Sequence, residues 1–204
     1  MIKLLKKDFL ILFRSIGFLI SYISNNFIMI LIFSIALSSQ TVEIINGIFW
    51  SVFFINSILI ASKIVEEEFV EESFFILITY FSVEKIMISK IIIVSFYLVF
   101  FGILNAFFIF FVFSKLIINF NLIVFLLISS FSISAISIML NLMLYKVQSK
   151  YLLNYLLYIP LSIPIFLSSL NGSLEFKIDW IFLSLICLFL YNSFALFYSE
   201  KFLF

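Results

Sequence analysis

The chain has 204 residues, of which 65% are hydrophobic and only 11% are charged, and its net charge at pH 7 is +1. Soluble domains carry about 25% charged residues, so this composition, with a mean hydropathy of +1.32, excludes an ordinary water-soluble fold. Its long apolar runs do not alternate with polar residues, as the strands of a transmembrane β-barrel would. We therefore expect an all-α integral membrane protein whose residues 1–204 form a single transmembrane domain.

The first predicted element is a helix over residues 1–14. Its basic residues fall within one sector of about 100° on a helical wheel: Lys3, Lys6, Lys7 and Arg14. This pattern favours an amphipathic helix that lies on the membrane surface. A positive flank that simply orients the first span is the alternative interpretation.

Six transmembrane helices follow from the charge-free runs, each of which reaches the roughly 20 residues that a helix needs to cross the hydrocarbon. We expect them at about residues 17–38, 44–62, 91–113, 122–145, 152–168 and 180–199. With the N-terminus inside, all but two of the twelve basic residues lie on the inner side, the exceptions being Lys115 and Lys177. The lysine and arginine bias therefore predicts that both termini are cytoplasmic. A multi-pass protein of the bacterial inner membrane is our first expectation, and the mitochondrial inner membrane is the alternative.

Residues 63–90, between the second and third spans, are predicted to form a cytoplasmic loop with a short helix. Five glutamates fall within seven residues of this segment: Glu66, Glu67, Glu68, Glu71 and Glu72. The apolar run that follows, at 73–83, is too short to cross a bilayer. We interpret the segment as a docking site for a soluble partner, and a solvated acidic face is the alternative.

The fourth span carries small or polar residues on one helical face: Ser130, Ser134, Ser137 and Asn141. In lipid, such faces let helices approach closely and share hydrogen bonds. We expect this face to pack against another helix, rather than to line a substrate path, because no charged residue accompanies it.

The fifth span contains both prolines of the chain, Pro160 and Pro164. Each proline removes a backbone donor and clashes with the preceding turn, so we expect this helix to kink near the middle of the membrane. A static kink, with the freed carbonyls satisfied by neighbouring helices, and a functional hinge are equally good interpretations.

Several kinds of chemistry are excluded by the residues that the chain lacks. It has no histidine and a single cysteine, Cys187, so imidazole cannot bind haem or metal and a Ser–His or Cys–His nucleophile cannot form. It has no P-loop motif for nucleotide phosphates. No charged residue is expected deep within a span, which argues against a proton pump. We therefore expect no catalytic residue, metal site or cofactor, and an energy source outside the chain.

Four segments of the chain carry a resemblance to a known family: Phe13-Arg14, Gly47-Ile48-Phe49-Trp50, Glu67-Glu68-Phe69-Val70-Glu71-Glu72-Ser73 and Pro160-Leu161-Ser162-Ile163-Pro164. In this order they resemble features of the cytochrome c maturation protein B (CcmB, or haem exporter protein B) family. Those features are a basic N-terminal helix, a Gly-Ile-x-Trp segment, an acidic segment after the second span and paired prolines in the fifth. The resemblance covers nearly the whole chain. The chain departs from the family at Glu72, where the family has glycine, and at 79–82, where it has a proline-rich turn.

The family comprises membrane subunits of ABC-2 type ATP-binding-cassette transporters. The resemblance implies that two copies of this chain pair with two copies of a soluble ATPase (CcmA-like). It also implies that the ATPase contacts the segment after the second span, at Glu66, Glu67, Glu68, Glu71, Glu72 and Phe74. The implied function is haem delivery for c-type cytochromes. Haem would be handled by a membrane protein (CcmC-like), a small membrane subunit (CcmD-like) and a haem chaperone (CcmE-like). The alternatives are an ABC-2 exporter subunit for a lipid, glycan or drug, and a structural subunit of a respiratory complex.

Overall fold

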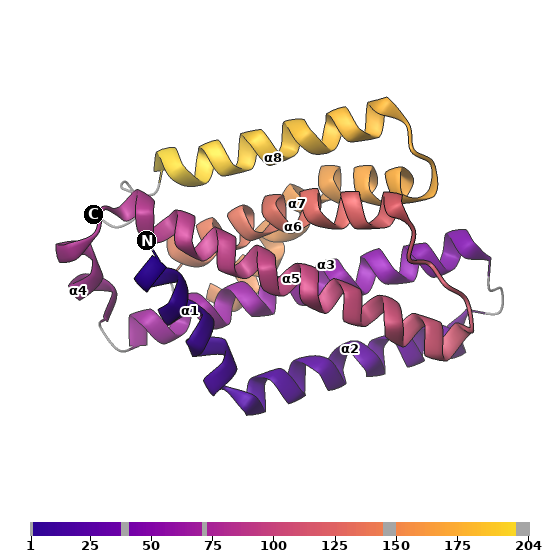
Figure 1. Ribbon diagram of the computed structural model, residues 1–204, viewed down its shortest axis with the longest axis horizontal. Coiled ribbons are helices and arrows are strands. Elements are labelled where there is room, and N and C mark those ends of the chain that lie inside the picture. Colours follow the sequence, from indigo (N-terminus) through magenta and orange to yellow (C-terminus); the bar gives the residue numbers. More distant parts are fainter. Residues whose placement is uncertain (1, 38–40, 71–72, 145–149, 199–204) are drawn as a thin grey trace.

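The computed structural model describes residues 2–37, 41–70, 73–144 and 150–198, and within them it contains helices and no strand (Figure 1). The helices are α1 (Ile2–Arg14), α2 (Ile16–Ala36), α3 (Val42–Val70), α4 (Ser73–Tyr80), α5 (Val83–Phe113), α6 (Phe120–Met143), α7 (Lys150–Leu174) and α8 (Ile178–Tyr198). Six of them, α2, α3 and α5 to α8, are long and apolar enough to cross a membrane. The predicted all-α fold with six spans is confirmed.

The six long helices form a bundle around α6, which contacts α3, α5, α7 and α8. The spanning parts of α3 and α6 are 72% and 67% buried, whereas those of α2 and α8 are only 17% buried. The exposed faces of these two peripheral helices are apolar, as at Ile28 in α2 and Phe189 in α8. Such faces suit contact with lipid, because a membrane helix hides its polar backbone and not its apolar side chains.

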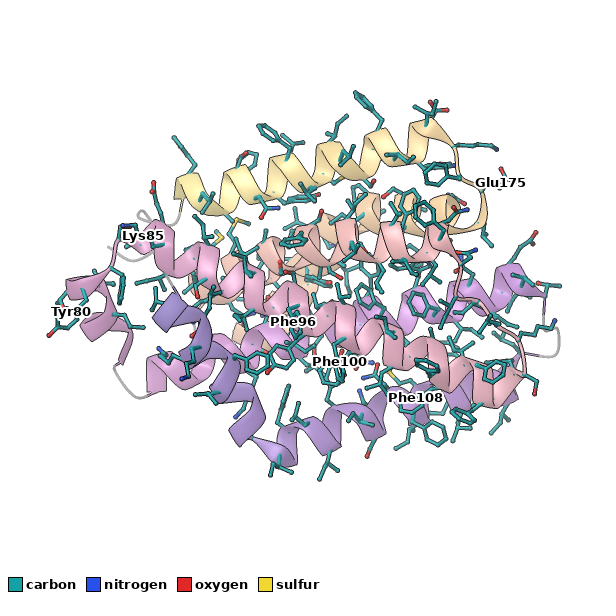
Figure 2. All side chains as sticks on the ribbon, viewed as in Figure 1. Tyr80, Lys85, Phe96, Phe100, Phe108 and Glu175 are labelled. Atoms are coloured by element: carbon teal, nitrogen blue, oxygen red, sulfur yellow. The ribbon has the colours of Figure 1, made fainter. Side chains whose placement is uncertain are left out.

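The bundle has two distinct ends (Figure 1). At the basal end, as we call it, lie α1, α4 and the last turns of α8. At the opposite, distal end lie residues 114–119 and 175–177, which connect α5 to α6 and α7 to α8. Figure 2 shows Tyr80 and Lys85 at the basal end and Glu175 at the distal end, with Phe96 and Phe100 of α5 between them.

Two of the helices, α3 and α5, are longer than a membrane requires. With 29 and 31 residues, they extend about 44 and 46 Å at 1.5 Å per residue, against about 30 Å of hydrocarbon. The loop expected at 63–90 therefore differs from the structure, in which α3 continues to Val70 and α5 begins at Val83. Only the short helix α4 stands between them among the described residues. No glycine or proline interrupts either helix in this region, so the charged residues mark a boundary of the apolar segment and not the end of a helix.

The distal connections are set by local backbone chemistry. Ser114 ends α5 in the left-handed conformation, with φ of 53°, and the side chain of Asn119 begins α6 by accepting a hydrogen bond from the Leu122 amide at 2.7 Å. Residues 171–173 lie beyond the fifth span expected at about 152–168, but in the structure they form the last turns of α7. Gly172 lies in this helix, and its lack of a Cβ atom lets the ring of Phe125 in α6 approach α7 closely.

Candidate functional site

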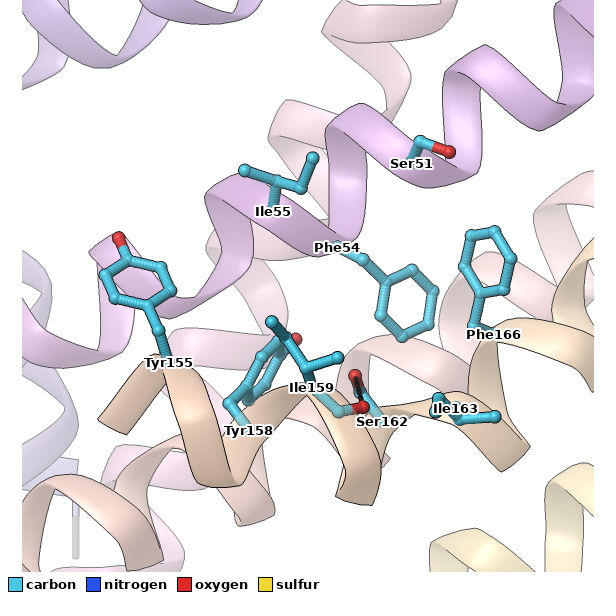
Figure 3. A pocket seen from close by; sticks show the side chains of 9 residues that line it. All are labelled: Ser51, Phe54, Ile55, Tyr155, Tyr158, Ile159, Ser162, Ile163 and Phe166. Atoms are coloured by element: carbon cyan, nitrogen blue, oxygen red, sulfur yellow. Dashed lines mark hydrogen bonds between the residues drawn. The ribbon is translucent and has the colours of Figure 1, made fainter. Parts of the chain in front are cut away.

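A groove with a volume of about 430 Å³ lies between α3 and α7 (Figure 3). The residues that line it are Ser51, Phe54 and Ile55 of α3 and Tyr155, Tyr158, Ile159, Ser162, Ile163 and Phe166 of α7. Ile55, Ile159 and Ile163 are exposed, so the groove opens on the outer surface of the bundle. Its volume lies within the range of small-molecule sites, about 300–1,000 Å³.

Beside the groove, a polar and an aromatic contact join α3 to α7. The hydroxyl groups of Ser57 in α3 and Tyr158 in α7 are 2.5 Å apart, so one donates a hydrogen bond to the other. The rings of Phe54 and Phe166 pack edge to face, with their centroids 5.3 Å apart. No charged side chain lines this groove, and its chemistry suits an apolar molecule with a few hydrogen-bonding groups.

The groove wall formed by α7 contains both prolines. α7 continues as a helix through Pro160 and Pro164, so the prolines do not break it. The hydroxyl group of Tyr191 in α8 donates a hydrogen bond to the carbonyl oxygen of Leu161 at 2.8 Å, so α8 contacts the backbone of α7 between the two prolines. The kink, in its static or its hinge interpretation, stays a prediction.

The predicted packing face of α6 is buried. Ser130, Ser134 and Ser137 are each 0% exposed. The hydroxyl groups of the first two donate to carbonyl oxygens of α6 itself, those of Leu126 and Phe131. Asn141 bonds across helices, because its Oδ1 atom accepts a hydrogen bond from Nδ2 of Asn154 in α7 at 2.9 Å. None of the four residues lines the groove between α3 and α7.

The basal end contains a buried charged cluster that the sequence analysis missed. Lys90 in α5 is 1% exposed and Asp8 in α1 is 2% exposed, and Ser89 donates a hydrogen bond to Oδ2 of Asp8 at 3.1 Å. Tyr97 of α5 donates to the carbonyl oxygen of Phe9 at 3.0 Å. Helix α1 is therefore fixed to α5 by polar contacts, and its Leu4 is buried in the core of the bundle. The sequence predicts that Lys90 lies in the loop at 63–90, but in the structure it lies in the third turn of α5.

The residues expected to contact an ATPase lie only partly in the described structure. Glu66, Glu67 and Glu68 belong to the last turns of α3, and Phe74 to the first turn of α4. Only their backbone is described, and Glu71 and Glu72 lie outside the described residues. Further along α4, Leu77 and Ile78 pack against the core of the bundle. Part of the apolar run therefore contacts this chain itself.

A second missed feature is a network of asparagines near the middle of α2, α3 and α5. The Oδ1 atom of Asn26 accepts hydrogen bonds from Nδ2 of Asn56 and of Asn105, each at 3.1 Å. Nδ2 of Asn25 donates to Oδ1 of Asn56 at 2.6 Å. The residues of α2 that are buried are Tyr22, Asn26 and Ile30, so these bonds are central to its attachment. Asn26, Asn56 and Asn105 each lie within a charge-free apolar run, and polar residues in such runs often bond to another helix. This pattern is the sequence signal for the network.

The described residues contain no group of three or more histidine, cysteine, aspartate or glutamate side chains with the geometry of a metal site. Comparison with known protein families, with curated proteins and with solved structures finds no match to this chain. The fold and the contacts above are therefore the basis for a functional proposal, together with the resemblance of the four sequence segments.

Proposed function

We propose that this chain is the membrane subunit of an ATP-binding-cassette complex, and that a partner ATPase changes the shape of the groove between α3 and α7. The observation that carries the proposal is the continuity of α3. One helix, Val42–Val70, forms a wall of the groove and also contains Glu66, Glu67 and Glu68 at the basal end. A force applied at these glutamates would move the groove wall, because a helix transmits displacement along its axis.

Two further features support a mechanical role. Helix α4 packs on the bundle next to α3, so a partner that moves α4 also moves the base of α3. The opposite wall, α7, contains Pro160 and Pro164, each of which costs the helix a backbone hydrogen bond and weakens it locally. The groove would then open or close by a displacement of α3 against a bendable α7.

The cargo that we propose is haem, for delivery to c-type cytochromes, with the bacterial inner membrane as the location. The support for this cargo is the resemblance to the cytochrome c maturation protein B family, and the apolar lining of the groove is compatible with it. Haem is a substrate here, and histidine-bearing partner proteins would hold its iron, because this chain has no histidine.

The experiment that tests the ATPase contact is co-purification from native membranes. We expect a tagged chain to bring down an ATP-binding-cassette ATPase, and the triple variant Glu68→Lys, Glu71→Lys and Glu72→Lys to lose it, because the predicted contact depends on negative charge. The variant Glu43→Lys, at the distal end, is the control and should keep the ATPase. Unchanged recovery of the ATPase with the triple variant would contradict the proposal.

A second arm of this experiment tests the cargo. Deletion of the chain should abolish covalently bound haem in c-type cytochromes, measured by haem staining of denatured membrane proteins. Normal cytochromes in the deletion strain would exclude haem as the cargo. If an ATPase nevertheless co-purifies with the tagged chain, the chain remains assigned as a transporter subunit.

A further inference from the structure

The distal end contains a second groove, separate from the one between α3 and α7, which we call the distal groove. Its volume is about 690 Å³, and nine residues line it: Val42, Glu43, Gly47, Leu170, Asn171, Leu174, Glu175, Lys177 and Trp180. They come from the start of α3, the end of α7, the connection that follows it and the start of α8. Three membrane-spanning segments begin or end here, so the groove lies at the level where the heads of amphiphilic molecules lie in a membrane.

The lysine in this groove is already engaged. Lys177 forms an ion pair with Glu175 and is also attracted by Asp179. The hydrogen bond and charge of Lys177 hold the pKa of Glu175 below its usual value, and Glu175 raises the pKa of Lys177 in turn. Both groups are therefore charged at neutral pH, and the pair is lost only as the pH falls through the lowered pKa of Glu175 or rises through the raised pKa of Lys177. An anion that entered the groove would have to displace Glu175.

Glu43 is different, because no cation among the described residues lies within ion-pair distance of its carboxylate. It is exposed in the first turn of α3 and faces the same groove as Trp180, whose side chain is partly buried. A carboxylate and an indole ring are the two groups that bind an ammonium ion well, the first by a charge-assisted hydrogen bond and the second through its π face. Leu170 and Leu174 add an apolar surface beside them.

We propose that the distal groove binds an amphiphile with an ammonium head, which places its nitrogen against Glu43 and its apolar chain against Leu170, Leu174 and Trp180. The charge pattern selects a cation over an anion, since Lys177 is engaged by Glu175 and Glu43 is available. The apolar residues and the position at the ends of three spans select an amphiphile over a small soluble cation. The proposal is independent of the ATPase and of haem, because neither contributes a residue to this groove.

The test uses tryptophan fluorescence of the full chain in nanodiscs of a neutral galactolipid, whose head carries no ammonium group. The probes are a bromoalkylamine, a bromoalkanoic acid and a bromoalkanol of equal chain length, since bromine quenches a nearby indole. We expect the amine to quench with at least about tenfold higher affinity than the other two, as a charged hydrogen bond predicts. Trp180→Phe should remove most of this saturable quenching, because Trp180 lines the groove and the second tryptophan, Trp50, does not.

Two charge variants make the test specific. Glu43→Gln should lower the affinity for the amine about tenfold, and Glu175→Gln should raise the affinity for the bromoalkanoic acid by releasing Lys177. Glu84→Gln, which removes an exposed glutamate at the basal end, is the matched control and should change neither affinity. Equal affinities for all three probes, or an amine affinity that Glu43→Gln leaves unchanged, would overturn the proposal.

Nanodiscs that contain phosphatidylethanolamine identify the source of the ammonium head. If this lipid competes with the bromoalkylamine, the occupant is a lipid headgroup. If the amine binds equally well in its presence, the occupant is a soluble amphiphilic amine. Both results uphold the site, and they assign it to different ligands.

Discussion

Replacing Lys90 by glutamate is expected to destabilise the folded bundle by about 3–5 kcal/mol, the cost of leaving a buried charge without compensation. Lys90 is 1% exposed, and the residue before it, Ser89, donates a hydrogen bond to the buried carboxylate of Asp8. A glutamate at this position would place a second negative charge in the contact between α1 and α5. We expect a lower midpoint in a thermal unfolding experiment in detergent, and faster proteolytic release of α1.

The control for this prediction lies on the same helix. Lys85 is exposed, so Lys85→Glu makes the same change of charge at a solvated position, where substitutions usually alter stability by less than about 0.5 kcal/mol. Combining Asp8→Lys with Lys90→Glu should recover part of the lost stability, because it restores opposite charges across the contact. Equal unfolding midpoints for Lys85→Glu and Lys90→Glu would show that the buried cluster does not stabilise the bundle.

The second large effect is expected at Gly172, where replacement by alanine should cost about 1–3 kcal/mol, as overpacking does in a close-packed core. A Cβ atom there would overlap the ring of Phe125, which is 0% exposed. The next residue, Ser173, joins α7 to α3, since its hydroxyl group accepts hydrogen bonds from Nδ2 of Asn46 at 2.8 Å and from Nε1 of Trp50 at 2.9 Å. A shift at Gly172 would strain these bonds as well.

Gly47→Ala is the matched control, because nothing lies within 4 Å of the position where its Cβ atom would be. Alanine is a better helix former than glycine by about 1 kcal/mol, so this variant should be as stable as the original chain or more so. The free energy of unfolding of both variants is measured by titration with a denaturing detergent. The pair Gly172→Ala with Phe125→Leu should regain stability, and similar losses for Gly47→Ala and Gly172→Ala would contradict the steric explanation.

The number and type of the spans could be predicted because both depend on composition and on the length of apolar runs. The helix bounds at 63–90 could not, since the glutamates of this segment end the apolar run but do not end α3. The contact of Asp8 with Ser89 joins residues that are 81 positions apart, and no local pattern indicates such a pairing. The fifth span was expected to end near residue 168, but α7 continues through Gly172, where the missing side chain allows close packing against Phe125.

The candidate groove was also only partly predictable. The prolines indicated that α7 is unusual, but its partner across the groove, α3, follows from tertiary packing alone. The asparagine network shows the same limit, because Asn26, Asn56 and Asn105 each interrupt an apolar run, yet their meeting point depends on how α2, α3 and α5 pack. The contact of Glu66, Glu67 and Glu68 with an ATPase stays a prediction.

The distance between α3 and α7 across their groove, measured by pulsed electron paramagnetic resonance in the complex with the ATPase, shows whether ATP changes the shape of the groove. Spin labels at Ile55→Cys and Ile163→Cys, both exposed positions on opposite walls, are introduced after the native cysteine is removed by Cys187→Ser. We predict that ATP binding changes the distance distribution and that the Glu68, Glu71 and Glu72 charge reversal abolishes the change. If the distance distribution is the same with and without ATP while the ATPase stays bound, the ATPase does not move α3 against α7.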